Sequence, residues 1–200
     1  MPIPKKIHFC WMSGAPYPDD IKRCMDSWHK HMPDYEYKLW DMNTFDSGMW
    51  KYTREALAKG KYAFVSDVVR LYALYTEGGI YLDSDIEVYK SFDSLLDNLA
   101  FSGIESGGRL AAWMMASQPG NSLFKELLSY YDDKSFLCKD GSMDLTPNTI
   151  PTTRTLSKHG MVNENRLQKL KHITIYPEEY FCPKNPWTGK IHITENTYAM

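Results

Sequence analysis

The sequence predicts a single α/β domain, and three observations along its 200 residues support this fold class. The N-terminal segment reads as strand, helix and strand, an order typical of a parallel α/β sheet. A strongly apolar helical pattern over residues 61–77 then runs through Gly78 and Gly79 into a further strand. No internal repeat, low-complexity tract or linker divides the chain, and its length suffices for one core. We therefore expect residues 1–200 to form one domain.

The first three elements follow from periodicity and from breaks between the segments. Apolar residues alternate in residues 5–12, which predicts a strand, and a Gly- and Pro-containing loop follows. Residues 19–32 suit a helix, since two aspartates at its start complement the helix dipole. The alternation returns in residues 35–41 and predicts a second strand. A parallel pair joined by a helix is the expected result.

The middle of the chain carries the strongest helix signal. Residues 48–60 predict a helix, and residues 61–77 predict a more apolar one that stops at the two glycines. A strand over residues 80–89 follows. A hairpin is expected from residues 100–104 and 110–116. Two helices are expected over residues 121–133 and 151–159, and two strand-like segments over residues 171–177 and 190–200.

Composition excludes several classes of function. The formal net charge of -2 lacks the basic surplus of a nucleic-acid-binding protein, so no such partner is expected. No apolar run approaches the ~20 residues that a membrane-spanning helix needs. The apolar stretch near the N-terminus is too short for a signal peptide, and the 4 Cys form no C-x-x-C pair. These features predict a cytoplasmic protein with reduced thiols.

Two carboxylates stand in the strand predicted after the glycines. Asp83 and Asp85 are two residues apart, so on a strand they share one face at a separation of ~7 Å. Tyr81 shares that face. Asp is a poor strand former and costly to bury without a partner, which a hard divalent metal would supply. The alternative is a strand end that emerges into solvent.

A polar patch interrupts the apolar helix that precedes this strand. Ser66, Asp67 and Arg70 lie at i, i+1 and i+4, on one side of the helix. Only Gly78 and Gly79 separate that helix from the aspartate-bearing strand. We therefore expect the patch and the two carboxylates to line one site at the carboxyl edge of the sheet.

One competing chemistry also uses an apolar strand ending in D-x-D. In phosphatases of the haloacid dehalogenase type, the first Asp is a nucleophile and the second a general acid. Those enzymes carry Thr or Val two residues after the second Asp, where this chain has Glu87. The pair Asp132 and Asp133 ends a helix and does not supply the missing acidic motif. This reading ranks last.

The pattern S-D-x-x-R…G-G-x-Y-L-D-x-D resembles the core of the DXD-containing sugar transferases, most closely glycosyltransferase family 32. That family includes capsular and lipopolysaccharide sugar transferases and yeast-type mannosyltransferases, and the similarity extends to glucosylating toxin domains. The opening IPKKIHFCWMSG, residues 24–41 and the stretch YFCPKNPWTGKIHITENTYA fit in order. The resemblance thus covers most of the chain.

This resemblance implies a GT-A fold, a three-layer α/β/α domain with a mixed, mainly parallel sheet. It implies a metal-dependent retaining glycosyltransferase that moves a hexose from a nucleotide-sugar to a glycan or lipid-linked oligosaccharide in polysaccharide biosynthesis. A UDP-sugar is favoured because Trp11 and Asn43 match uridine readers, and GDP-mannose stays open. A lipid-linked acceptor would bring a cytoplasmic enzyme to the inner membrane face as a peripheral protein.

The resemblance also implies residue roles. Asp85 ligates Mn²⁺ or Mg²⁺, and Asp83 contacts the ribose and sugar, or the metal through water. Asp67 and Arg70 hold the donor sugar beside Ser66. The nucleoside contacts are expected from three further residues: Tyr81, Trp11, which stacks on the base, and Asn43.

The C-terminus departs from the family pattern. Family members continue after T-E-N-T-Y-A with an apolar residue, a His-His pair and a Ser-Trp, and one of these groups is expected to complete the metal shell. This chain stops at Met200, so we expect it to lack that segment and to bind metal and donor weakly. A catalytically weak or inactive nucleotide- or glycan-binding module of the same fold is the alternative.

Overall fold

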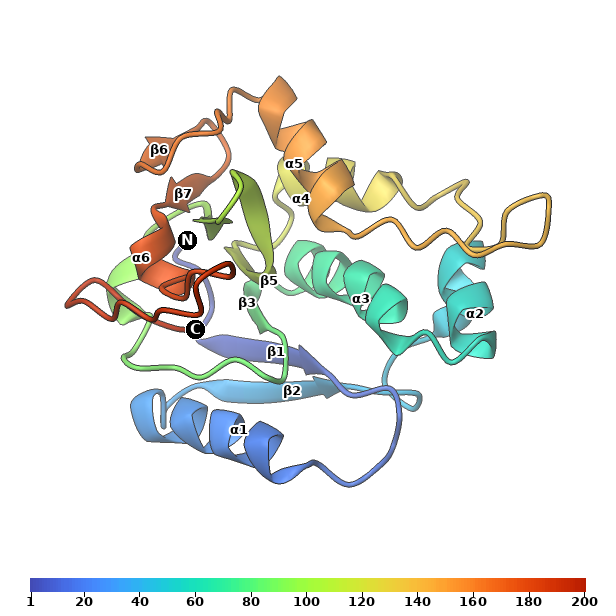
Figure 1. Ribbon diagram of the computed structural model, residues 1–200. Helices are drawn as coiled ribbons and strands as arrows, with labels where there is room; N and C mark the ends of the chain where they lie inside the picture. Colours follow the sequence, from blue (N-terminus) through green and yellow to red (C-terminus); the bar gives the residue numbers. More distant parts are fainter.

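A seven-stranded mixed sheet, in the order β2-β1-β3-β5-β4-β7-β6, forms the centre of the fold in a computed structural model that describes residues 1–200 (Figure 1). The strands are β1 (Lys6–Cys10), β2 (Glu36–Trp40), β3 (Gly79–Leu82), β4 (Ala100–Glu105), β5 (Arg109–Ser117), β6 (Gln168–Lys169) and β7 (Thr174–Tyr176). Strand β1 pairs in parallel with β2 and β3, and β4 with β7. The other three pairings, β3 with β5, β4 with β5, and β6 with β7, are antiparallel. The mixed sheet confirms the expectation, but three of its six pairings are parallel and three are antiparallel, so the sheet is not mainly parallel.

Helices cover both faces of this sheet, as Figure 1 shows. They are α1 (Asp19–His31), α2 (Lys51–Ala58), α3 (Tyr62–Thr76), α4 (Ser122–Ser129), α5 (Thr149–Lys158) and α6 (Glu178–Phe181), with 3-10 turns η1 (Ser47–Met49) and η2 (Asp93–Leu95). One core joins α1 and α6 to a face of the sheet, and a second joins α2, α3, α4 and α5 to the other. The three-layer α/β/α architecture is therefore confirmed.

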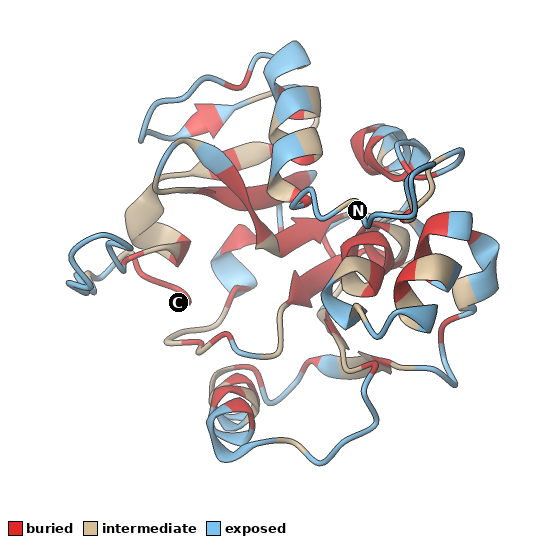
Figure 2. Cartoon of the chain, turned by 45° about the vertical axis from the view of Figure 1, so that its right-hand side comes forward, coloured by how far each residue is buried: buried red, intermediate tan, exposed pale blue.

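Alternation along β3 assigns its side chains to the two cores as the sequence predicts. Ile80 and Leu82 pack in the core beneath α1, while Tyr81 packs in the core beneath α3. Buried residues in Figure 2 accordingly concentrate on the strands and on the inner sides of the helices. Tyr81 is thereby placed on the α3 side of the sheet.

The strand predicted over residues 80–89 ends earlier than expected. β3 stops at Leu82, and the carbonyl of Asp83 accepts a hydrogen bond from the Ile86 N–H at 3.2 Å, which closes a turn. Asp and Ser side chains favour turns because they compete for nearby backbone groups. The prediction that Asp83 and Asp85 share one face of a strand is therefore wrong; they lie on a turn.

The predicted C-terminal strand over residues 190–200 is also absent. That stretch makes only isolated bridges, Lys184 with Ile191 and Val88 with Ala199. The short elements β6 and α6 were not expected from the sequence, since two and four residues carry too little periodicity. Residues 199 and 200 instead lie against the segment that follows the Asp83 turn.

Two glycines make the close approach of α3 and β3 possible. Gly78 and Gly79 have φ of +67° and +100°. A Cβ on Gly79 would lie 2.6 Å from the Lys6 carbonyl oxygen, and one on Gly78 would lie 2.6 Å from Pro119 Cδ. Only glycine fits this conformation and spacing. No helix in the structure combines the length and the apolar character that a bilayer crossing requires.

Candidate active site

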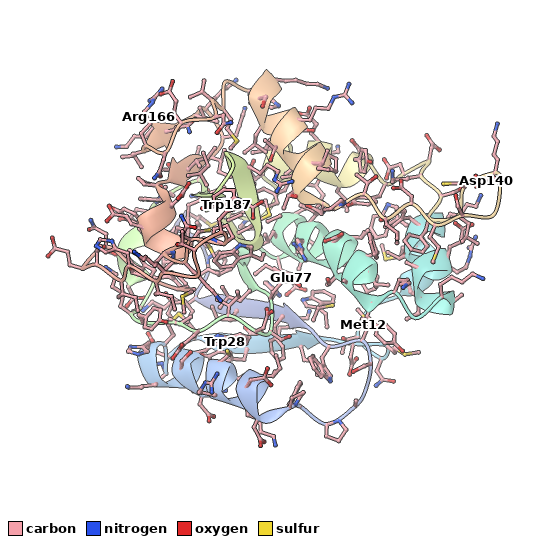
Figure 3. The ribbon with its side chains drawn as sticks, in the orientation of Figure 1. Met12, Trp28, Glu77, Asp140, Arg166 and Trp187 are labelled. Atoms are coloured by element: carbon pink, nitrogen blue, oxygen red, sulfur yellow. The ribbon has the colours of Figure 1, made fainter.

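A cavity of about 630 Å³ lies at the carboxyl ends of β1 and β3, against α3. Because β1 and β3 are parallel neighbours, their carboxyl ends meet at one edge of the sheet. Met12, labelled in Figure 3, lies just beyond β1 and lines this cavity. Seven residues named from the sequence also line it: Trp11, Ser66, Asp67, Arg70, Tyr81, Asp83 and Asp85.

Arg70 links three elements at the floor of the cavity. Its Nη2 lies 3.1 Å from Asp83 Oδ1 and 3.2 Å from Asp67 Oδ1. Its Nη1 donates to the Ala112 carbonyl on β5 at 2.8 Å, and its Nε donates to the Ser66 carbonyl at 3.3 Å. The guanidinium also lies over the Tyr81 ring, 5.0 Å from its centroid. Most of its hydrogen-bonding capacity is therefore used inside the protein.

The charge of this buried arginine is stabilised by its partners. Burial alone lowers the pKa of Arg70, but the nearby Asp83, Tyr81 and Asp67 outweigh burial and raise the pKa. Arg70 therefore stays protonated and acts as a fixed cation between the two carboxylates.

Asp67 is the most enclosed acid of the site. Burial raises the pKa of its carboxyl to about 6, and the Arg70 charge offsets part of that rise. Its backbone carbonyl accepts a hydrogen bond from Asn148 Nδ2 at 3.2 Å, and the same Nδ2 lies 3.0 Å from the Tyr131 hydroxyl. Asn148 precedes α5 and lines the cavity, so it fastens that helix to α3 beneath Asp67.

Asp83 is held by one of its two oxygens. Oδ1 accepts from the Tyr81 hydroxyl at 3.0 Å as well as from Arg70. Burial raises the pKa of Asp83, while Arg70 and the Tyr81 hydroxyl act to lower it. The side chain is still 31% exposed, and Oδ2 accepts no hydrogen bond from the protein. Asp83 therefore presents a free oxygen in a fixed orientation.

Asp85 is exposed, and its carboxylate forms no ion pair or hydrogen bond within the chain. Together with Asp83 Oδ2, it offers carboxylate oxygens, the ligands that Mg²⁺ and Mn²⁺ prefer. No group of three or more His, Cys, Asp or Glu side chains in the structure could hold a metal by itself. The donor set thus fits a divalent ion bound jointly with substrate phosphates, which commonly takes only one or two carboxylates.

Trp11 and Asn43 differ in position. Trp11 is half-buried at the cavity wall, where its Nε1 donates to the Ala15 carbonyl at 2.7 Å and its ring lies 5.0 Å from that of Tyr17. Asn43 lies in an exposed turn after β2, where its N–H donates to Asp41 Oδ1 at 2.8 Å. Asn43 does not line the cavity, so the structure does not bring it together with the other seven residues.

A second cavity, of about 440 Å³, lies on the other side of the D-x-D turn. It shares Asp83, Asp85 and Trp113 with the larger cavity. Glu105 and Arg109, paired at 3.2 Å, lie on its wall. The sequence did not reveal Trp113, because it stands within the apolar run of β5 and reads as a core residue. The two carboxylates therefore stand between two spaces.

Comparison with known proteins shows that part of this chain is similar to glycosyltransferases. Residues 18–102, which include the α3 patch and the D-x-D turn, match the family model described as "Glycosyltransferase sugar-binding region containing DXD motif". The solved structure "PaToxG Glycosyltransferase" superposes with a TM-score of 0.58 over 78% of this chain and 70% of that chain, at 20% identity. At that identity the likeness concerns the fold.

Two curated relatives match shorter stretches. The chain is 31% identical over 124 residues, 60% of its length, to "Uncharacterized protein At4g19900" of Arabidopsis thaliana. It is 35% identical over 101 residues, 47% of its length, to "Inositol phosphoceramide mannosyltransferase 3" of Schizosaccharomyces pombe. The chain spans only 18% and 27% of these two proteins.

These matches show similarity to DXD-containing glycosyltransferases as a class. They do not identify family 32 or a capsular role. The α/β/α layers and the mixed sheet agree with the fold of the compared structure, and the D-x-D turn lies within the matched region. The chain therefore has a fold similar to that of a solved glycosyltransferase, and its residues 18–102 resemble the DXD-containing sugar-binding region of such enzymes.

Proposed function

We propose that this chain is a metal-dependent, retaining glycosyltransferase that moves a hexose from a nucleotide-sugar to a glycan or lipid-linked acceptor. The observation that carries the proposal is the pair of carboxylates with unpaired oxygens, Asp83 and Asp85, at the junction of two cavities. Two substrates need two spaces that meet at the reacting bond, and a departing diphosphate needs neutralising charge at that point.

The larger cavity is the proposed donor site. Its volume of about 630 Å³ lies within the range of pockets that enclose small-molecule ligands. Trp11 offers a partly exposed indole at one wall, suited to stack on a flat base. Asp67 and Arg70 stand at the floor beside Ser66, where a carboxylate oxygen can accept from sugar hydroxyls. A UDP-sugar is the favoured donor, and GDP-mannose is the alternative.

Asp85 and Asp83 Oδ2 are the proposed metal ligands, for Mn²⁺ or Mg²⁺. When bound, such an ion neutralises the charge that builds on the leaving diphosphate and orients it. The chain's own contribution is to fix the first carboxylate: Arg70 and the Tyr81 hydroxyl hold Oδ1 and leave Oδ2 free for a ligand. In this proposal Arg70 is mainly a positioning residue, because it holds the Asp83 carboxylate in place.

The smaller cavity is the proposed acceptor site, with Trp113 as the wall common to both substrates. An acceptor hydroxyl would attack the anomeric carbon from the face that the diphosphate leaves. The new bond joins the hydroxyl oxygen to that carbon, the bond to the diphosphate breaks, and a diphosphate oxygen takes the hydroxyl proton. This course, which retains the anomeric configuration, follows from the family resemblance.

The biological setting is proposed on the same resemblance. It comprises polysaccharide biosynthesis, of which capsule formation is one example, and a cytoplasmic location at the inner membrane face. A phosphatase of the haloacid dehalogenase type is disfavoured, because residues 18–102 match a glycosyltransferase region and the fold is similar to that of a solved glycosyltransferase.

A binding module with the same fold is the second candidate. The observation in its favour is that the protein supplies only two free carboxylates to a metal. A pure binder would bind a nucleotide-sugar and leave it intact, whereas a transferase with water as the acceptor releases free sugar slowly. Hydrolysis of the donor in the presence of Mn²⁺ therefore separates the two.

A thermal-shift screen tests the proposal. UDP-glucose, UDP-galactose, UDP-N-acetylglucosamine and GDP-mannose are each added with and without Mn²⁺. A donor at ~100 times its Kd stabilises the native state by about 2.7 kcal/mol. We expect one nucleotide class to raise Tm only when Mn²⁺ is present, and Asp85→Asn to abolish the rise. A Tm that no donor changes, with or without metal, contradicts the proposal.

A further inference from the structure

A tight hairpin of residues 184–191 projects beside α6 and carries Trp187 at its tip. Lys184 bridges to Ile191, and the Asn185 N–H donates to the Lys190 carbonyl at 2.8 Å. Asn185 Oδ1 accepts from the N–H groups of Trp187 and Thr188 at 3.0 and 2.9 Å. Figure 2 shows this segment, which we name the Trp187 hairpin, as an exposed loop between α6 and the C-terminus.

The side chains of this hairpin have an unusual combination of exposure and charge. Trp187, labelled in Figure 3, is 74% exposed, and Ile191 and Ile193 nearby are 50% and 51% exposed. Lys184 and Lys190 flank the tryptophan, and neither forms an ion pair. No acidic residue occurs between positions 183 and 193. An exposed tryptophan with aliphatic neighbours and lysines around it suits a partner that is apolar and anionic.

We propose that the Trp187 hairpin is a docking element for an anionic lipid surface. Tryptophan prefers the interface between headgroups and acyl chains, where its ring is buried and its N–H stays wet. Isoleucine side chains enter the same apolar layer, and the two lysines contact anionic headgroups.

A soluble glycan fits this surface less well than a lipid does. Sugar sites combine an aromatic face with polar groups that read hydroxyls. The one amide close to Trp187 in the chain, that of Asn185, is already used to close the turn. Aliphatic neighbours and lysines, in a stretch of sequence without acidic residues, are instead the composition of an interfacial contact.

The position of the hairpin gives the docking a consequence for the acceptor. Lys184 and Pro186, at its base, line the smaller cavity together with Asp83 and Asp85. A protein docked through Trp187 would therefore present that cavity close to the lipid surface, where a lipid-linked acceptor resides. This step rests on the proposed function, whereas the docking itself does not.

Vesicle co-sedimentation tests the docking. The full chain is mixed with vesicles of phosphatidylcholine alone, or with about 30% phosphatidylglycerol, at low and at physiological salt. We expect binding to the anionic vesicles that weakens with salt. Trp187→Ala should lower the partition coefficient at least about tenfold, and Lys190→Gln about fivefold. Matched controls are Leu167→Ala and Lys125→Gln, which remove exposed side chains elsewhere and should bind as wild type.

The possible results distinguish lipid docking from a glycan site and from a failure of the proposed function. Equal sedimentation of wild type and Trp187→Ala, or no binding of wild type to anionic vesicles, overturns the docking proposal. Loss of binding to a soluble oligosaccharide panel in Trp187→Ala, without vesicle binding, also overturns it in favour of a glycan site. Each protein is assayed in parallel for Mn²⁺-dependent hydrolysis of a nucleotide-sugar, which Trp187→Ala should leave unchanged. Vesicle binding without any hydrolysis would contradict the proposed function and leave the docking standing.

Discussion

Arg70 Nη2 lies 3.1 Å from Asp83 Oδ1, and this ion pair fixes the first carboxylate of the D-x-D turn to helix α3. The same nitrogen lies 3.2 Å from Asp67, so one buried cation serves two acids. The pair also explains how a carboxylate can stand in a largely apolar region: its charge is compensated on one side and open to the cavity on the other.

Removing this cation should destabilise the fold as well as the site. Arg70→Met leaves Asp67 and Asp83 without their partner, and a broken buried ion pair costs about 3–5 kcal/mol. Denaturant titration measures the free energy of unfolding. Lys22→Met is the control, since its pair with Asp19 is exposed and should change stability by less than about 1 kcal/mol. Equal stability of the two variants would show that Arg70 does not anchor the site.

Gly79 should be intolerant of a side chain for steric reasons. Gly79 and Gly107 have nearly equal φ, +100° and +98°, but only at Gly79 would a Cβ meet the backbone, 2.6 Å from the Lys6 carbonyl oxygen. Gly107→Ala therefore costs only the conformational strain of about 1–2 kcal/mol, and Gly79→Ala costs clearly more. Thermal or chemical unfolding of both variants measures the difference. Equal losses would mean that β1 and β3 separate easily at this point.

The stability of the protein should fall between pH 6.5 and 4 through His8. Trp40 Nε1 donates to His8 Nδ1 at 3.0 Å, and His8 Nε2 donates to the Gly78 carbonyl at 2.8 Å, so the ring is neutral. Burial lowers the pKa of His8 to about 4. Below pH 6.5 His8 binds a proton in the unfolded chain but stays neutral in the folded chain. The free energy of unfolding therefore falls by about 3 kcal/mol before it levels near pH 4.

His8→Gln isolates that contribution. Glutamine cannot titrate, so the difference in unfolding free energy between wild type and variant should change across this pH window and stay constant above it. Measuring the difference cancels the opposite contribution of Asp67, whose raised pKa favours the folded state as pH falls. A difference that does not depend on pH would contradict the assignment to His8.

Substitutions of Trp11 and of Asn43 should have different effects on donor binding. Trp11 lines the donor cavity, and base stacking on an aromatic side chain is worth about 1–3 kcal/mol, so Trp11→Ala should weaken nucleotide binding by about 5- to 150-fold. Asn43 lies in an exposed turn outside the cavity, and Asn43→Ala should bind as wild type. Calorimetric titration with the free nucleoside diphosphate and Mn²⁺ gives both values. The reverse pattern would restore the role that the resemblance gave to Asn43.

The sequence predicted the fold most accurately where periodicity was long. The helix over residues 61–77 and the N-terminal strand, helix and strand agree with α3, β1, α1 and β2 to within two residues. It failed at residues 190–200, where alternating side chains make only two isolated bridges, Lys184 with Ile191 and Val88 with Ala199. Strand pairing is a tertiary property that alternation alone cannot establish.

At the site, Asp83 and Asp85 lie close together because of a turn, and not because they share one face of a strand as expected. The sequence placed Asp83 and Asp85 on one face of a strand, whereas a turn after Leu82 exposes both to the same two cavities. Trp113 could not be assigned, because its position depends on how β5 packs against α3. The charged residues of the site lie close together in the sequence, whereas other residues that line the cavities come from distant segments.

Mn²⁺-dependent hydrolysis of a nucleotide-sugar tests the central claim most directly. Wild type is compared with Asp85→Asn, which removes a free carboxylate oxygen, and with Asp97→Asn, an exposed acid that lines neither cavity. Metal stabilisation of a leaving group is worth several kcal/mol, so we expect Asp85→Asn to lower the rate at least about a hundredfold and Asp97→Asn to leave it unchanged. Equal rates for Asp85→Asn and wild type, with both proteins folded, would contradict the account.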